Sequence, residues 1–68
     1  MRYAVVIENA PDNYCAYVPD LPGCVASGAT VEATKNEICE AIRFQLEGLL
    51  ADGLIIPAPT SVVQYVEA

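Results

Sequence analysis

The sequence predicts a small α+β domain with the element order β-β-β-α-β. Segments rich in β-branched and aromatic residues, separated by turn residues, indicate strands, and an apolar repeat at steps of three and four indicates one helix. A chain of 68 residues leaves room for a single domain, residues 1–68. The expected elements are strands at residues 3–8, 14–18 and 24–28, a helix from residue 31 to about residue 52, and a last strand at residues 61–66.

The first two strands should form an antiparallel hairpin, because only the turn-forming residues 9–13 separate them. Side chains alternate along a strand, so Tyr3 and Ile7 fall on one face with Val5 between them on the same side. Ala4 and Val6 fall on the other face. Both faces are apolar, which is typical of a strand in the interior of a sheet.

A second turn separates the second and third strands at residues 19–23. Pro22 fixes φ at the second position of this turn, and Gly23 accepts the positive φ that a type II turn requires at the third position. The turn therefore returns the chain into a third, antiparallel strand.

The helix has a start and a stop signal. Thr30 is a good N-cap, Glu32 lies in the first turn where an anion is favoured, and Gly53 is suited to the left-handed C-terminal cap. Phe44 lies at the edge of the apolar stripe and is either a core residue or an interface residue. The stripe itself contains Val31, Ile38, Ala41, Ile42, Leu46 (or Gln45), Leu49 and Leu50.

The helix returns the chain across the sheet, so the last strand should run parallel to the first, beyond the prolines Pro57 and Pro59. Placing it beside the first strand gives a four-stranded mixed sheet of order 3-2-1-4, with one helix on one face. The other face stays uncovered, and 54% of the residues are hydrophobic. We therefore expect self-association through Ala4, Val6 and Tyr65, with Val63 less favoured.

Charge and composition exclude several functions. The net charge is −6, and the basic residues are Arg2, Lys35 and Arg43, too few to neutralise a nucleic acid backbone. A basic partner protein fits this charge, and so does a surface that only maintains solubility. The absence of His excludes His-based catalysis and His-ligated metals. No carboxylate pair or phosphate-binding glycine loop is present, so we expect no enzymatic activity, cofactor or metal.

The three cysteines, Cys15, Cys24 and Cys39, have no C-x-x-C spacing. We interpret each as a small buried apolar residue. No leader sequence and no apolar run long enough to span a membrane are present, so we expect a cytoplasmic protein.

Several segments resemble the HicB-like antitoxin family. The most specific is the run Val18-Pro19-Asp20-Leu21-Pro22-Gly23-Cys24, and the resemblance covers nearly the whole chain. Two departures are visible: Ala29 stands where the family commonly has Asp, and the DNA-binding domain of regulatory HicB proteins does not follow residue 68. Further matching segments are residues 2–8, 14–17, 27–28, 30, 32–33, 36, 40–42, 49, 52–53, 57 and 59.

The resemblance implies a degraded ribonuclease H-like fold without catalytic carboxylates. It also implies a role in neutralising HicA, a small, generally basic toxin that cleaves mRNA, and assembly into homodimers or larger homo-oligomers. The alternatives are a self-assembling or ligand-responsive module with no toxin partner and, less favoured, a residual ribonuclease. Because the specific motif lies in the second turn, we expect a partner interface at Tyr17, Asp20, Leu21 and Pro22, with a purely structural turn as the alternative.

Overall fold

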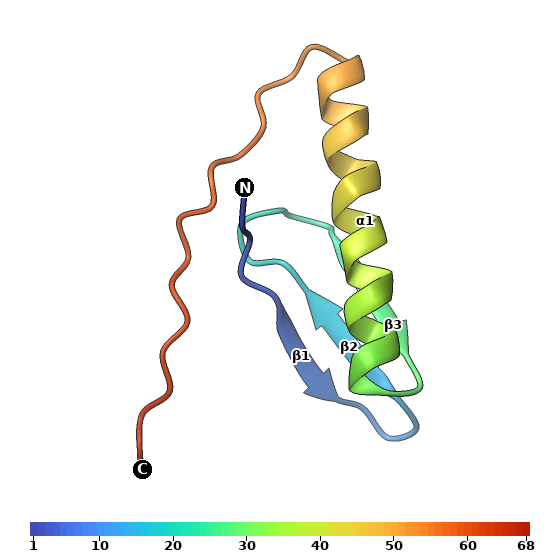
Figure 1. Cartoon of the computed structure of the whole chain (residues 1–68), viewed down its shortest axis with the longest axis vertical. Coiled ribbons are helices and arrows are strands. Elements are labelled where there is room, and N and C mark those ends of the chain that lie inside the picture. Colours follow the sequence, from blue (N-terminus) through green and yellow to red (C-terminus); the bar gives the residue numbers. More distant parts are fainter.

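The computed structural model describes residues 1–68 and contains one antiparallel sheet and one helix. The strands β1 (Val6–Asn9), β2 (Tyr14–Tyr17) and β3 (Val25–Gly28) lie in this order across the sheet. The helix α1 (Val31–Ala51) crosses one face, and the remaining C-terminal residues extend along the side of the molecule on which β1 lies (Figure 1). The predicted hairpins and helix are confirmed. No helix in the chain has the length and apolarity needed to cross a lipid bilayer.

The expected four-stranded mixed sheet of order 3-2-1-4 is wrong. The sheet has three strands, all antiparallel, and residues 61–66 form no strand. The main-chain groups of residues 55–68 make no hydrogen bond to other main-chain groups, so no ladder joins them to β1. Consequently β1 is an edge strand and not an interior one.

The register of the sheet separates its two faces. Val6 lies opposite Tyr17, which in turn lies opposite Val25, and side chains at paired positions point to the same side. The next row, Ile7 with Ala16 and Ala26, faces α1 and packs in the core. Tyr3 and Val5 also pack against the core, as the alternation along the first strand predicts.

The core lies between the sheet and α1. Leu21 and Ile38 are its largest fully buried apolar side chains, with relative exposures of 0% and 1%. Part of the predicted apolar stripe is not covered: Val31 and Leu50 are exposed, and Phe44 is 80% exposed and therefore no core residue. The buried apolar residues are Ala16, Val18, Leu21, Cys24 and Ile38.

Both predicted ends of α1 are confirmed. The Ala33 amide donates to the Thr30 hydroxyl oxygen at 3.0 Å, which satisfies one of the free amides of the first turn. At the other end, the Leu54 amide donates to the Leu49 carbonyl at 2.9 Å across Gly53, whose φ is +69°. This pattern is the Schellman motif and it ends the helix.

Close packing between β3 and α1 depends on Gly28. A Cβ atom at this position would lie 2.8 Å from the Thr34 main-chain nitrogen. Thr34 is fully buried, and its hydroxyl donates to the Thr30 carbonyl at 2.7 Å. A side chain at residue 28 would therefore push the first turn of α1 away from the sheet.

Candidate partner-binding site

The connection between β2 and β3 is a compact, hydrogen-bonded loop. The Val18 amide donates to the Cys24 carbonyl at 3.2 Å, and the Leu21 amide donates back to the Val18 carbonyl at 3.1 Å. The Cys24 amide donates to the Leu21 carbonyl at 3.1 Å around Gly23, whose φ is +79°. The predicted type II features, with Pro22 before a glycine of positive φ, are confirmed.

The four residues expected at a partner interface lie in different environments. Leu21 is fully buried and anchors the loop in the core. Tyr17 and Pro22 are exposed, and the Pro22 carbonyl accepts a hydrogen bond from the Gln45 side chain of α1 at 3.3 Å. Asp20 is half-buried. The structure therefore leaves Tyr17 and Pro22 accessible and assigns Leu21 a packing role.

Asp20 joins the loop to the C-terminal segment. Its Oδ2 accepts hydrogen bonds from the main-chain amides of Thr60 and Ser61 at 3.1 and 2.9 Å, and its Oδ1 accepts from their hydroxyls at the same two distances. The Ser61 amide is the largest cause that lowers the pKa of Asp20, with partial desolvation acting in the opposite direction. The partners of Asp20 therefore lie 40 and 41 residues further along the chain and not within its own turn.

A second contact holds the same segment near β1. The Tyr3 hydroxyl donates to the Pro57 carbonyl at 2.6 Å. Together with Asp20, this contact fixes the first part of the C-terminal segment against the body of the protein. Sequence reasoning missed Thr60 and Ser61, because their contact with Asp20 spans 40 and 41 residues and leaves no local signal.

The face of the sheet opposite α1 is open and carries a shallow hollow of about 470 Å³ over β2 and β3. The cross-strand pair Tyr17 and Val25 borders it, with exposures of 42% and 66%. Val6, expected at an oligomer interface, lies in the same row, and Ala4 is half-buried just before β1. Tyr65 lies on no strand and is 95% exposed in the C-terminal segment. The residues lining the hollow are Cys15, Ala16, Tyr17, Val25, Ala26 and Ser27.

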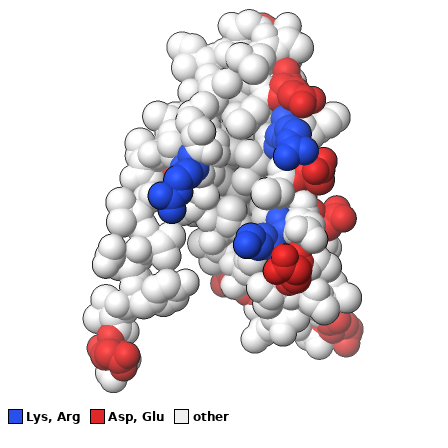
Figure 2. Space-filling model, viewed as in Figure 1, with Lys and Arg blue, Asp and Glu red and all other residues white.

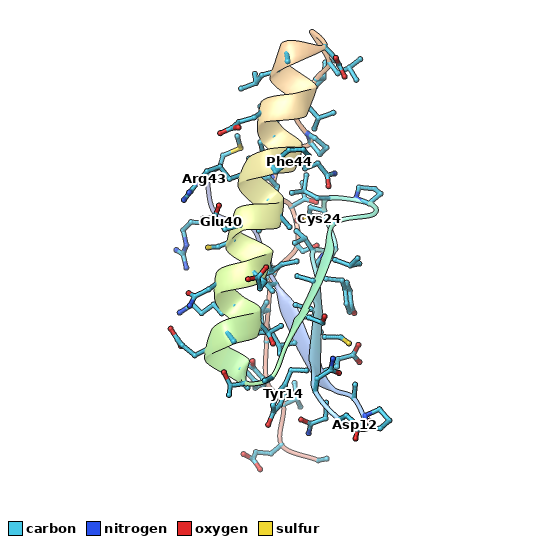
Figure 3. All side chains as sticks on the ribbon, turned by 90° about the vertical axis from the view of Figure 1, so that its right-hand side faces the viewer. Asp12, Tyr14, Cys24, Glu40, Arg43 and Phe44 are labelled. Carbon is cyan, nitrogen blue, oxygen red and sulfur yellow. The ribbon has the colours of Figure 1, made fainter.

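Charged groups are distributed unevenly over the surface. Acidic and basic side chains gather along the outer side of α1 (Figure 2), where Arg43 and Glu40 form an exposed ion pair of 3.1 Å. Glu8 is the single charged residue of the three strands, and Asp12 follows it at the β1–β2 turn, the end of the sheet remote from Cys24 (Figure 3). The open face therefore combines an apolar hollow with carboxylates toward one end and no basic residue in its strands.

The cysteines differ from their expected burial. Cys24 is buried as predicted, and desolvation raises the pKa of its thiol, which disfavours the reactive thiolate. The prediction is wrong for Cys15 and Cys39, which are exposed. Cys15 reaches the open face, where its side chain is a small apolar part of the hollow.

Comparison with known proteins identifies the class to which this fold and motif belong. The family model of the HicB-like antitoxin of bacterial toxin–antitoxin systems matches residues 3–68. The chain belongs to the HicB-like antitoxin family. The resemblance carried by the loop motif is thus confirmed over almost the full chain.

Individual relatives agree with this assignment. A protein of Haemophilus phage HP1, known as an uncharacterized 14.9 kDa protein, is 38% identical over 97% of this chain, and the match spans 50% of the phage protein's own length. A UPF0150 protein of Helicobacter pylori is 40% identical, with 98% of this chain and 94% of that protein covered. A solved complex of the toxin HicA3 and the antitoxin HicB3 contains a chain similar to this one, with a TM-score of 0.75 and 27% identity over 88% of this chain and 70% of that chain.

Proposed function

We propose that this protein is a non-enzymatic antitoxin that binds and neutralises a small basic toxin of the HicA type. Its family membership and its similarity to a chain in a toxin–antitoxin complex support this role. The net charge of −6 suits a basic partner. A toxin that cleaves mRNA meets its substrate in the cytoplasm, so we expect the antitoxin to act there.

The open face of the sheet is the surface that we assign to the toxin. The observation that carries this assignment is the apolar hollow, which lies directly beside the family-specific loop and is covered by no part of the chain. Tyr17 and Val25 would supply the central apolar contacts, since aromatic side chains are enriched among the residues that dominate binding energy. Glu8 and Asp12 would meet basic side chains at the periphery.

The loop residues would then have two roles in recognition, contact with the toxin and positioning of the contact residues. Tyr17 and the exposed ring of Pro22 would contact the toxin directly. Leu21 and Asp20 would hold these contact residues in position, Leu21 by filling the core and Asp20 by fixing the C-terminal segment behind the loop. Both interpretations of the motif, partner interface and structural turn, are combined in this proposal.

Neutralisation would follow from competition for the same cations. A toxin that cleaves RNA must bind phosphates with basic side chains, and carboxylates of an acidic partner can occupy those side chains instead. Binding of the antitoxin over this surface would keep RNA away from the toxin without any chemical step. The carboxylate–cation contacts make the complex sensitive to salt.

Co-expression with a HicA-type toxin from the neighbouring gene tests the proposal. The wild-type protein should restore growth and co-purify with the toxin, whereas Val25→Lys, which puts a cation into the hollow, should lose both. Val25 is exposed, so this variant should remain folded by circular dichroism. Failure of the wild-type protein to bind and silence the toxin would remove the antitoxin function altogether.

The matched control is Phe44→Lys. It introduces the same charge at another exposed apolar residue, on α1 instead of the open face. Retained neutralisation by Phe44→Lys, with loss in Val25→Lys, supports docking on the open face. Equal loss in both variants, or loss in Phe44→Lys alone, contradicts it.

A further inference from the structure

The loop between β2 and β3 consists of two consecutive turns that share Leu21. The Leu21 amide closes the first turn on the Val18 carbonyl, and the Cys24 amide closes the second turn on the Leu21 carbonyl, each at 3.1 Å. Asp20 lies in the first turn and Pro22 lies in the second. Because only Leu21 separates them, the position of Asp20 helps to determine the position of the exposed Pro22 ring.

The Asp20 carboxylate joins the first turn to a strap, which we define as residues 56–61. Thr60 and Ser61 donate four hydrogen bonds to its two oxygens, at distances of 2.9–3.1 Å. The loop itself contains three main-chain hydrogen bonds, at 3.1–3.2 Å. The strap therefore gives the loop more hydrogen bonds than the loop's own backbone does, and its docking should restrict the motion of the first turn.

The strap is held weakly enough to detach while the sheet and α1 stay intact. None of its main-chain groups bonds to another main-chain group, and its remaining hydrogen bond is the one that the Pro57 carbonyl accepts from Tyr3. Residues 61–68 are all exposed, and a segment with so few buried contacts opens at low free energy. Pro57 and Pro59 restrict the detached strap, so docking costs less conformational entropy than in a flexible segment.

We infer that docking of the strap raises the affinity of the protein for its toxin by ordering the β2–β3 loop. With the strap docked, the Pro22 ring is held in the position that contacts the toxin. With the strap detached, binding has to order the loop as well, and this ordering lowers the affinity. No strap residue lines the hollow of the open face, so the strap acts through the loop and not by contact with the toxin. The inference rests on the proposed function, in which the loop and the open face bind the toxin.

The same coupling acts in the reverse direction, because an equilibrium link between two sites is reciprocal. A toxin that binds the ordered loop more tightly also favours the docked strap. The main-chain amides of Thr60 and Ser61 should therefore exchange more slowly in the complex than in the free protein. Equal exchange would mean that the two sites are not coupled, and faster exchange would mean that the toxin displaces the strap. Both results contradict the inference.

Amide exchange of the free protein tests whether the strap orders the loop. The double variant Thr60→Val with Ser61→Pro removes three of the four donors to Asp20 and leaves the Thr60 amide. The amides of Leu21 and Cys24 should then exchange faster than in the wild-type protein, with an unchanged helical circular dichroism signal. Unchanged exchange of these two amides would show that the strap does not order the loop.

Two further variants are matched controls. Thr60→Ser with Ser61→Thr interchanges the two residues and keeps all four donors, so the loop amides should exchange as in the wild-type protein. Val62→Pro introduces a proline ring one residue further on, where the amide makes no hydrogen bond, and should also leave the loop unchanged. Faster loop exchange in either control would assign the effect of the double variant to a general disturbance of the segment, against the inference.

Calorimetric titration with a purified, catalytically inactive HicA-type toxin tests the effect on affinity. The double variant should bind with a Kd about fivefold or more above the wild-type value, and both controls should bind like the wild-type protein. Equal affinity of the double variant and the wild-type protein would overturn the inference and leave the proposed function in place. A wild-type protein that binds no toxin would instead remove the proposed function, and the inference with it. Weaker binding without faster loop exchange would mean that the strap contacts the toxin directly, which also contradicts the inference.

Discussion

The body of the protein and its C-terminal segment contain similar apolar residues, but these residues differ in burial and in strand pairing. In residues 3–51, the strand side chains point alternately to the two faces of a hydrogen-bonded sheet, and the row on the inner face is covered by α1. In residues 54–68, comparable side chains are largely exposed, and side-chain contacts at Tyr3 and Asp20 hold the backbone. The difference teaches that strand-like composition is not sufficient for a strand: residues 61–66 pair with no neighbouring strand although the outer edge of β1 is free.

The largest expected contrast between the two regions is in stability. Leu21→Ala removes a fully buried side chain and should lower the free energy of unfolding by about 2–5 kcal/mol. A core of this size supplies only about 3–5 kcal/mol in total, so the variant should be largely unfolded. Tyr65→Ala, at an exposed position of the segment, should change the monomer's stability by less than about 0.5 kcal/mol.

Urea titration followed by the helical circular dichroism signal measures both variants, at concentrations low enough to exclude association. A Leu21→Ala protein as stable as the wild type would mean that the loop is not part of the core. A large loss in Tyr65→Ala would mean that the segment is integral to the fold of the single chain.

The contact between β3 and α1 provides the next test, within the body alone. Gly28→Ala places a methyl group 2.8 Å from the Thr34 nitrogen, so the helix must shift, and we expect a loss of about 1–3 kcal/mol. Gly48→Ala is the control, and it should change the free energy of unfolding in the opposite direction. Beyond its chain neighbours and the backbone of its own helix, no atom lies within 4 Å of the added Cβ, and replacing a glycine inside a helix should stabilise the protein by about 0.5–1 kcal/mol.

The same urea titrations rank the two glycine variants against the wild-type protein. Equal stability of Gly28→Ala and Gly48→Ala would show that the helix does not approach the sheet closely at residue 28. This test matters for function because β3 forms one side of the proposed toxin-binding face.

The same comparison shows which elements of the fold can be predicted from the sequence. Local signals were sufficient for the hairpins, the Pro22-Gly23 turn, the Thr30 cap and the Gly53 terminus, because each depends on residues adjacent in the chain. The fourth strand was wrong because pairing depends on a distant edge. Strand propensity reports only a fit to a pleated surface and does not identify the neighbour.

The candidate site was predictable in its location but not in its details. The specific run of residues 18–24 indicated where to look, and the structure places it beside the open hollow. The burial of Leu21 and the contact from Asp20 to Thr60 depend on tertiary packing. A sequence pattern with a period of two or 3.6 residues contains no information about such contacts.

The link between the two regions can be broken with a change of one atom. Asp20→Asn replaces an acceptor with a donor, so part of the carboxamide would face the amides and hydroxyls of Thr60 and Ser61. We expect faster hydrogen exchange at these two amides and an unchanged helical signal. Asp12→Asn, in the β1–β2 turn, is the control and should leave their exchange as it is. Unchanged exchange in Asp20→Asn would mean that the segment is held by other contacts.

Acid should weaken the same contact between Asp20 and the C-terminal segment in the wild-type protein. We expect this change in amide exchange to be the smallest of the effects predicted here. The hydrogen bonds lower the pKa of Asp20 in the folded state, so its contribution to stability is fully present above the unfolded pKa, about 3.9 for aspartate. The contribution is lost as the pH falls through the lower folded pKa. Exchange at Ser61, referenced to a core amide to remove the intrinsic pH dependence, should therefore accelerate only below the unfolded pKa. The protonated carboxyl of Asp20 and the carboxamide introduced by Asp20→Asn both place a donor against donors, so this variant should lack the acid step. A step that survives in the variant would assign the transition to a different carboxylate.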